Sequence, residues 1–298
     1  MTSTRWAQAL PLLAVLGSVT ALGLGTSLAK QLFPQVGSLG TTALRVGFSA
    51  LLMLLMLLVW RPWRWALSRA DALSLLRYGV ALGFMNLLFY QSLKTIPFGV
   101  AVAIEFSGPL AVACWGSRRR IDFAWIALAI VGLGLLLPLG HSVSTLDLLG
   151  VGYALAAAVC WATYIVFGKR VGHLHAGHSV ALGLSVAALT VVPFGVAHAG
   201  ADLLQPGVLA LGLAVAAISS ALPISLEMVA LKRLTPAAFG VMISLEPAVA
   251  ALLGLLILHE QLTALQWLAI VLVMGAAVGS AATAKPEAHR GVADEIVQ

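Results

Sequence analysis

The sequence predicts an all-α integral membrane protein with ten transmembrane helices in two inverted five-helix repeats. Of its 298 residues, 61% are hydrophobic and 9% are charged, whereas a soluble domain carries about 25% charged residues. The apolar residues also lie in runs of about 20, the length that crosses the hydrocarbon core as a helix. Strands of a membrane β-barrel would be about ten residues long with alternating polarity, so the runs favour helices.

Ten such runs follow one another, separated by short breaks rich in Pro, Gly and basic residues. Arg5 precedes the first run as in a secretory signal, but the run has a counterpart later in the chain, which favours a retained helix. The runs lie near residues 9–29, 39–60, 72–93, 98–116, 122–139, 148–168, 178–197, 206–229, 238–258 and 263–283.

Sequence landmarks recur at a nearly constant offset. Lys30 and Lys169 close the first and sixth runs, and Pro97 and Pro236 open the fourth and ninth, each pair 139 positions apart. This spacing indicates a duplicated five-helix unit. Because five is odd, the second copy must enter the membrane inverted, a plan found in secondary transporters. The predicted divisions are a first repeat at 1–140, a second repeat at 147–283 and a disordered cytoplasmic tail at 284–298.

Basic residues predict the orientation. Fourteen Lys and Arg residues fall on the side of the termini, and only Lys30 and Lys94 fall on the other. The positive-inside rule therefore predicts that both termini are cytoplasmic. The net charge of +6 is explained by this topology and by lipid headgroups, so no nucleic-acid partner is expected.

Four charged residues within the apolar runs stand out, because a charge at mid-bilayer costs about 2.5–3.5 kcal/mol. They are Arg45, Glu105, Glu227 and Glu246. Arg45 has three interpretations: its side chain extends to the interface, pairs with a Glu, or binds a substrate carboxylate. Glu105 and Glu246 are the predicted proton-coupling residues, with structural pairing as the alternative. Proline cannot donate to the carbonyl four residues back, so helix breaks are predicted at Pro109, Pro247 and Pro223.

Other polar and aromatic residues complete the predicted substrate site. Asn86 and Tyr90 share a helix face in the third run, where interhelical hydrogen bonding is the alternative to lining a cavity. Trp161 and Tyr164 line the cavity or form an interfacial belt. Gly275 and Gly279 form a G-x-x-x-G step that predicts the seam of a homodimer.

Several function classes are excluded. The chain has no G-x-x-x-x-G-K-[ST] loop for ATP, no catalytic Asp pair and no nucleophile elbow, so an enzyme is not expected. His173, His175 and His178 lie in a short connection and are interpreted as a solvated loop. No metal or cofactor is therefore predicted.

Two signatures resemble the EamA group of the drug/metabolite transporter superfamily: Thr42-Ala43-Leu44-Arg45, and Ser244-Leu245-Glu246-Pro247 followed by Glu260, Leu262-Thr263 and Gln266. A closer similarity, running from about residue 10 to 282, is to the threonine/homoserine exporters of bacterial inner membranes. Its motifs are Ser27-Leu28-Ala29-Lys30, Met85-Asn86-Leu87-Leu88-Phe89-Tyr90, Glu105-Phe106-Ser107-Gly108-Pro109-Leu110-Ala111-Val112, Ser117-Arg118-Arg119 and Leu222-Pro223-Ile224-Ser225-Leu226-Glu227-Met228.

The resemblance implies export of small hydrophilic amino acids in exchange for protons, with Ser107 added to the substrate site. In this hypothesis Glu105 binds the substrate ammonium or a proton, and Arg45, Asn86 or Tyr90 binds the carboxylate. The alternatives are export of aromatic amino acids, other metabolites or drugs and, in another class, an intramembrane enzyme.

Overall fold

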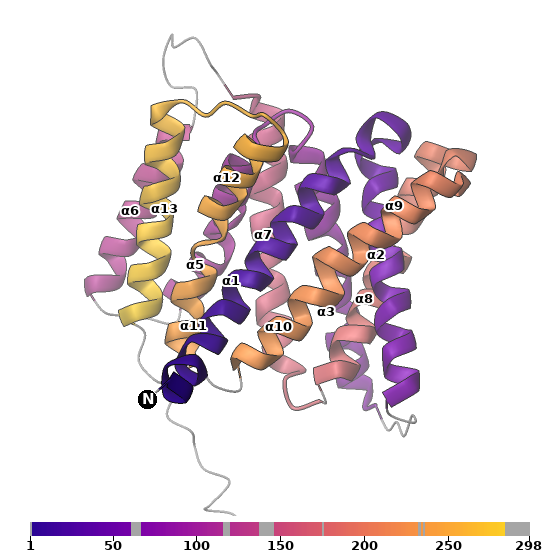
Figure 1. Cartoon of the computed structure of the whole chain (residues 1–298), viewed down its shortest axis with the longest axis horizontal. Coiled ribbons are helices and arrows are strands. Elements are labelled where there is room, and N and C mark those ends of the chain that lie inside the picture. Colours follow the sequence, from indigo (N-terminus) through magenta and orange to yellow (C-terminus); the bar gives the residue numbers. More distant parts are fainter. Residues whose placement is uncertain are drawn as a thin grey trace, which may run out of the picture.

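The computed structural model describes residues 2–60, 67–115, 120–136, 146–174, 176–231, 234 and 236–283. Within these ranges the chain is helical and contains no strand (Figure 1). The first half comprises α1 (Thr2–Lys30), α2 (Phe33–Trp60), α3 (Arg69–Ser92), α4 (Phe98–Glu105), α5 (Ser107–Trp115) and α6 (Arg120–Leu136). The second half comprises α7 (Leu148–Arg170), α8 (Ala176–Ala199), η1 (Gly200–Leu204), α9 (Pro206–Ala216), η2 (Ala217–Ala221), α10 (Leu222–Leu231), α11 (Pro236–Ile243), α12 (Glu246–Ile257) and α13 (Ala264–Thr283).

Eight helical segments are long and apolar enough to cross a membrane. The segment 98–112 is apolar but shorter, and α6 has only 17 described residues. The prediction of a helical multi-pass membrane protein is therefore confirmed. The ten-helix count and the repeat architecture stay predictions.

Three helical segments are interrupted near the predicted breaks. The backbone leaves the helix at Phe106, between α4 and α5, three residues before Pro109. It does so again just before α12, which carries Pro247 in its first turn. Pro223 lies in the first turn of α10, directly after the π-helical turn η2.

Helices from the two halves of the chain pack against each other. α2 packs against α8, α3 against α7, and α6 against α13. Gly79 allows one such approach, because a Cβ there would lie 2.7 Å from the Gly183 carbonyl oxygen of α8. The start of α1 and the end of α13 lie at the same lower edge of the molecule in Figure 1.

The predicted dimer seam faces the chain's own interior. A Cβ on Gly279 would lie 2.6 Å from the Trp125 ring of α6, and Gly275 faces Leu128 of the same helix. This use of the stripe within one chain gives no support to a dimer, and the homodimer stays a prediction.

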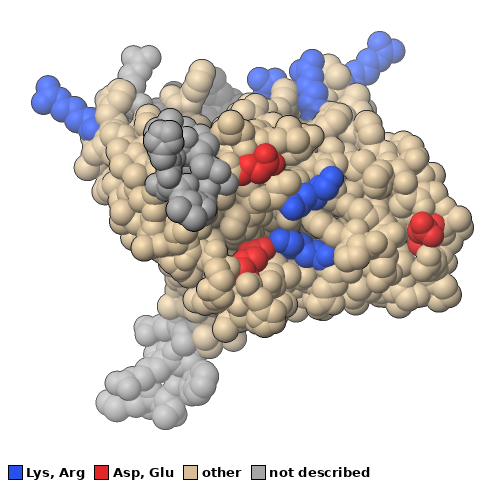
Figure 2. Space-filling model, turned by 90° about the horizontal axis from the view of Figure 1, so that it is seen from above, with Lys and Arg blue, Asp and Glu red and all other residues tan. Residues whose placement is uncertain are grey.

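Large apolar side chains cover much of the outside of the bundle. Leu189 is 78% exposed, Leu256 70% and Leu58 61%. Such exposed apolar side chains suit contact with lipid chains. Figure 2 views one end of the bundle from above, where a few charged side chains are scattered over an otherwise uncharged face.

Several predictions concern residues outside the described ranges. These are the disordered tail at 284–298, His175, and much of the basic charge behind the predicted orientation: Arg61, Arg64, Arg118, Arg119, Lys232, Arg233, Lys285 and Arg290.

Candidate functional site

Arg45 lies at the centre of the polar interior, partly buried on α2. Its Nε donates to the Ser219 hydroxyl at 2.9 Å, and its Nη1 donates to Asn86 Oδ1. The guanidinium also stacks over the Tyr90 ring, 5.4 Å from the ring centroid. Asn86 is itself held by a 2.9 Å bond from its Nδ2 to the Leu82 carbonyl oxygen, so the acceptor that faces Arg45 is fixed.

The Arg45 guanidinium keeps unused donors. It carries five N–H groups, and it donates two hydrogen bonds among the described residues. No carboxylate of the described chain lies within ion-pair distance of it. A guanidinium with free N–H groups can bind a carboxylate through two parallel hydrogen bonds.

Glu105 is the nearby opposite charge. It is 7% exposed at the last position of α4, and its carboxylate makes no hydrogen bond within the described structure. It is close enough to Arg45 and to Glu246 to interact electrostatically with both. A deep carboxylate without a fixed partner is available to a cation or a proton.

Two further carboxylates extend this polar interior through the second half of the chain. Glu246 begins α12 and interacts electrostatically with Arg45 and with Glu227 of α10. Unlike Glu105, Glu227 has a hydrogen-bond partner, because the Ser18 hydroxyl of α1 donates to it at 2.7 Å. Carboxylates from α4, α10 and α12 are thus brought to one interior region.

Tyr90 adds an unsatisfied polar atom. Its side chain is fully buried, and its hydroxyl has no well-formed hydrogen bond within the described chain. Thr26, Arg45 and Glu105 are among the polar side chains near it. A buried hydroxyl whose neighbour Thr26 is poorly placed for a hydrogen bond has capacity for a bound polar ligand.

The remaining predicted site residues lie around this cluster or away from it. The Ser107 hydroxyl donates to the Ile104 carbonyl oxygen at 2.7 Å, so it serves the break between α4 and α5. Trp161 packs edge-to-face on Phe106, with ring centroids 5.4 Å apart. Tyr164 stacks on Tyr78 instead of joining Arg45.

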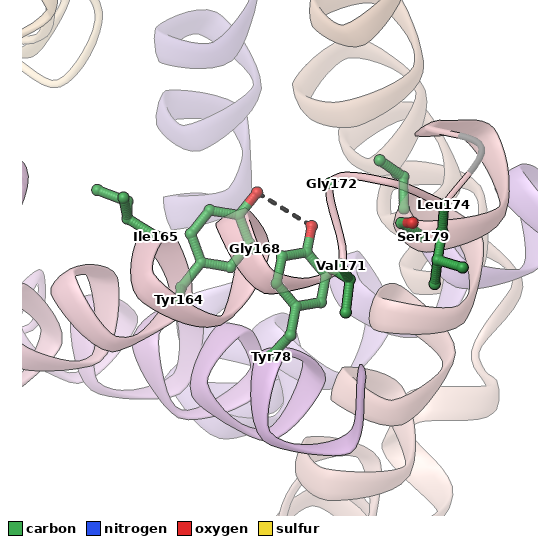
Figure 3. Close-up of a pocket in the computed structure, with 9 residues that line it drawn as sticks. Tyr78, Tyr164, Ile165, Gly168, Val171, Gly172, Leu174 and Ser179 are labelled. Carbon is green, nitrogen blue, oxygen red and sulfur yellow. Dashed lines mark hydrogen bonds between the residues drawn. The ribbon is translucent and has the colours of Figure 1, made fainter. Parts of the chain in front are cut away.

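A cavity of about 260 Å³ lies beside that tyrosine pair (Figure 3). The two rings stack with centroids 4.6 Å apart, and the Tyr78 hydroxyl donates to the Tyr164 hydroxyl at 3.2 Å. The cavity is lined by parts of α3, α7, α8 and the 171–174 connection, including Gly168, Val171 and Ser179. Tyr164, one of the lining residues, also interacts electrostatically with Glu227.

The other end of the bundle is closed by an ion pair. Lys30, the last residue of α1, lies 2.6 Å from Glu260 Oε1 in the connection between α12 and α13. Glu260 Oε2 also accepts a 2.7 Å hydrogen bond from the Phe98 backbone N–H, at the start of α4. α2 starts beside Lys30 and runs 28 residues to the side where α3 begins. Lys30 and the tyrosine cavity therefore lie at opposite ends of the bundle.

The sequence did not single out several of these contacts. Ser219, Ser18 and Tyr78 act as partners of the charged or aromatic residues. Serine is common in membrane helices, so only the charged partner across the bundle makes each one noticeable. Glu260 could be noticed in the sequence, because it belongs to the second signature that resembles the EamA group.

Comparisons with known proteins agree with this architecture. The model of the EamA-like transporter family matches residues 9–138 and again 148–281. The threonine/homoserine exporter RhtA of Escherichia coli (strain K12) is 49% identical over 278 residues, which is 93% of each chain. RhtA of Salmonella typhimurium (strain SL1344) is 48% identical over the same lengths.

More distant similarities extend the comparison. The uncharacterized inner membrane transporter YedA of Escherichia coli (strain K12) is 24% identical over 293 residues, 92% of each chain. A solved crystal structure with 19% identity superposes with a TM-score of 0.56, covering 91% of this chain and 99% of the other. At that identity the superposition shows similarity of the fold alone.

Proposed function

We propose that this chain, which belongs to the EamA-like transporter family, exports threonine, homoserine and similar small amino acids in exchange for protons. As a member of that family it is a multi-pass inner-membrane transporter and not an enzyme. The substrate class rests on the similarity of 48–49% over 93% of the chain to exporters named for these amino acids. The site rests on the structure.

The observation that carries the site is the pairing of opposite, uncommitted charges at the centre. An amino acid is a zwitterion and needs an anion for its ammonium and donors for its carboxylate. Glu105, without a hydrogen bond in the described chain, offers the anion, and the free N–H groups of Arg45 offer the donors. Asn86 and Tyr90 hold the guanidinium, and the Tyr90 hydroxyl has capacity for one more bond.

Proton coupling follows from competition for Glu105. One carboxylate cannot hold a proton and a substrate ammonium at once, so release of the amino acid on one side allows protonation there. Glu246 is a second carboxylate in electrostatic range and provides an alternative proton position. One elementary charge crossing 100 mV contributes about 2.3 kcal/mol, enough to drive export without ATP.

The chain crosses the membrane ten times in this proposal. α4 with α5, α9 with α10, and α11 with α12 are each one interrupted crossing, and α6 is a further crossing. Its 17 described residues span about 25 Å of the hydrocarbon core of about 30 Å. The start of α1 and the end of α13 lie at one edge of Figure 1, which supports an even number of crossings.

Two features support the inverted repeats at 1–140 and 147–283. The family model matches two successive segments of similar length. In addition, α3 packs on α7, and α1 packs on α10. A two-fold axis that exchanges the two halves would turn the first of these contacts into the second. With the positive-inside rule, both termini are cytoplasmic.

The substrate reaches the centre from the end that carries the tyrosine cavity. The Lys30–Glu260 pair closes the opposite end, and the cavity beside Tyr78 and Tyr164 leaves this end hollow. Because Tyr78 lies in the first half of α3, on the side of the chain termini, the cavity opens toward the cytoplasm if the termini are cytoplasmic as proposed. Rocking of the two repeats would reverse this arrangement.

The proposal is tested by efflux of radiolabelled threonine and homoserine from cells that express the chain. We expect efflux that a protonophore abolishes and that Glu105→Gln removes. Glu227→Gln is the matched control, since it removes the charge from a carboxylate that already has Ser18 as a partner. A correctly inserted chain that exports neither amino acid would refute the substrate assignment.

The aromatic lining of the cavity favours a second candidate, an aromatic amino acid. Tyr78 and Tyr164 could stack on such a side chain, and the volume of about 260 Å³ would hold it. Efflux of labelled phenylalanine in the same cells distinguishes the two. Phenylalanine export without threonine export would favour the second candidate.

A further inference from the structure

The turn η2 presents two consecutive serines to α2. It is π-helical, a geometry often found at functional sites. The Ser219 hydroxyl accepts from Arg45 Nε at 2.9 Å, and the Ser220 hydroxyl lies 2.7 Å from that of Ser49. Arg45 and Ser49 are four residues apart and share one face of α2. In a regular α-helix, consecutive side chains point about 100° apart, so the wider turn suits this double contact.

Ser219 also packs closely against α1. Its side chain is 3% exposed, and Gly25 of α1 lies against it. A Cβ added at Gly25 would lie 2.6 Å from Ser219 Cβ and 2.9 Å from its backbone nitrogen. The hydroxyl that faces Arg45 is therefore positioned by contacts with α1 and α2 together.

The two bonds to Arg45 fix the plane of its guanidinium. Ser219 holds Nε, and Asn86 holds Nη1. A planar guanidinium that is held at two of its nitrogens keeps its remaining N–H groups pointing in a fixed direction. Two parallel hydrogen bonds to a carboxylate require this fixed direction. Without the bond at Nε the flexible Arg side chain would regain rotamers.

We infer that Ser219 is a positioning residue, which aims the Arg45 guanidinium at the carboxylate of the transported amino acid. The inference rests on the proposed function, because it assigns the carboxylate to Arg45. It predicts that Ser219 governs recognition of the carboxylate and leaves recognition of the ammonium and side chain unchanged.

The experiment measures exchange in proteoliposomes, with threonine as substrate and threonine amide as a competing ligand that lacks the carboxylate. For Ser219→Ala we expect the KM for threonine to rise about fivefold to tenfold, the loss of one hydrogen bond to a charged group. The kcat and the inhibition constant of threonine amide should stay unchanged. Ser220→Ala, in the same turn but bonded to Ser49, is the matched control and should change neither constant.

Ser219→Cys is a second variant, which distinguishes loss of the hydrogen bond from a folding defect. It nearly keeps the side-chain volume and replaces the hydroxyl with a weak acceptor, so the same carboxylate-selective loss is expected. Equal losses for threonine and threonine amide in both variants would indicate a packing role and overturn the inference. An unchanged threonine KM would overturn it as well.

Arg45→Gln separates this inference from the proposed function. If Arg45→Gln removes the preference for threonine over the amide and the Ser219 variants do not, only the positioning role is wrong. If Arg45→Gln leaves the preference intact, the assignment of the carboxylate to Arg45 is wrong and the inference falls with it.

Discussion

The two ends of the bundle are joined by different chemistry. At one end, Glu260 of the second half binds Lys30 and the Phe98 N–H of the first half, at 2.6 and 2.7 Å. Asp147, at the start of α7, joins the same end by accepting a hydrogen bond from Thr95. At the other end the halves meet through the Tyr78–Tyr164 stack, beside a cavity of about 260 Å³, and through a partly exposed contact of 3.2 Å between His173 Nε2 and Asp71 Oδ1.

This difference suggests how the bundle could alternate between states. Ion pairs and hydrogen bonds are directional and are lost when partners separate by a few ångströms, so the charged end holds one defined closed geometry. Stacked rings tolerate sliding, and a cavity leaves room for movement. The charged end would therefore open as a unit, while the aromatic end would close by filling its cavity.

The largest stability effect is expected for Glu260→Ala. It leaves the Lys30 ammonium and the Phe98 N–H without partners, and both members of the pair are mostly buried, with side chains 19% and 15% exposed. We expect a loss of about 2 kcal/mol in the free energy of unfolding, measured by thermal unfolding in detergent.

Glu260→Gln is the control for that change. It keeps an oxygen for the Phe98 N–H and removes only the charge, so it should cost less. Equal melting temperatures for wild type and Glu260→Ala would show that this end is not held by the pair.

A second prediction isolates the ion pair with a double-mutant cycle. Lys30→Met, Glu260→Gln and the double variant should show a coupling of at least about 1 kcal/mol, the upper end of values for exposed pairs, because this pair is mostly buried. Thermal unfolding of the four proteins gives this coupling. Additive effects would mean that the 2.6 Å contact contributes no net stability.

A smaller effect is expected at the aromatic end. Tyr78→Phe removes the hydroxyl that bonds Tyr164 and keeps the stacked ring, so stability should fall by less than about 1 kcal/mol. Threonine efflux should stay close to that of the wild type. A loss of efflux would show that the hydroxyl itself, and not the ring, controls access from this end.

The smallest effect concerns acid stability at the charged end. The hydrogen bond from Thr95 and the backbone N–H groups of Gly150 and Leu149 lower the pKa of Asp147. A lowered folded-state pKa contributes stability above the unfolded value of about 3.9, and this contribution is lost as pH falls through the folded pKa. Asp147→Asn should therefore flatten the fall of melting temperature below about pH 4. An unchanged acid profile would contradict this role.

The sequence predicted the features that depend on local composition. Apolar runs located the helices, and Pro109 and Pro247 marked two interruptions because proline lacks an N–H. Glu105 was conspicuous as a charge inside an apolar run. These signals need no knowledge of which helices meet.

Contacts between distant helices could not be predicted in this way. Arg45 and Ser219 are 174 positions apart, and Lys30 and Glu260 are 230 apart. Only packing selects which of several polar residues meets each charge. For the same reason the sequence left open whether Tyr164 lines a cavity or forms an interfacial belt, and only the fold places it beside Tyr78, at the cavity of about 260 Å³.

Proton release on substrate binding tests the central claim most directly. Purified protein in weakly buffered detergent solution is titrated with threonine while a pH indicator reports protons. If the ammonium displaces a proton at Glu105, binding should release protons in the wild type, and Glu105→Gln should release none. Threonine binding to the wild type without proton release would contradict the competition at Glu105.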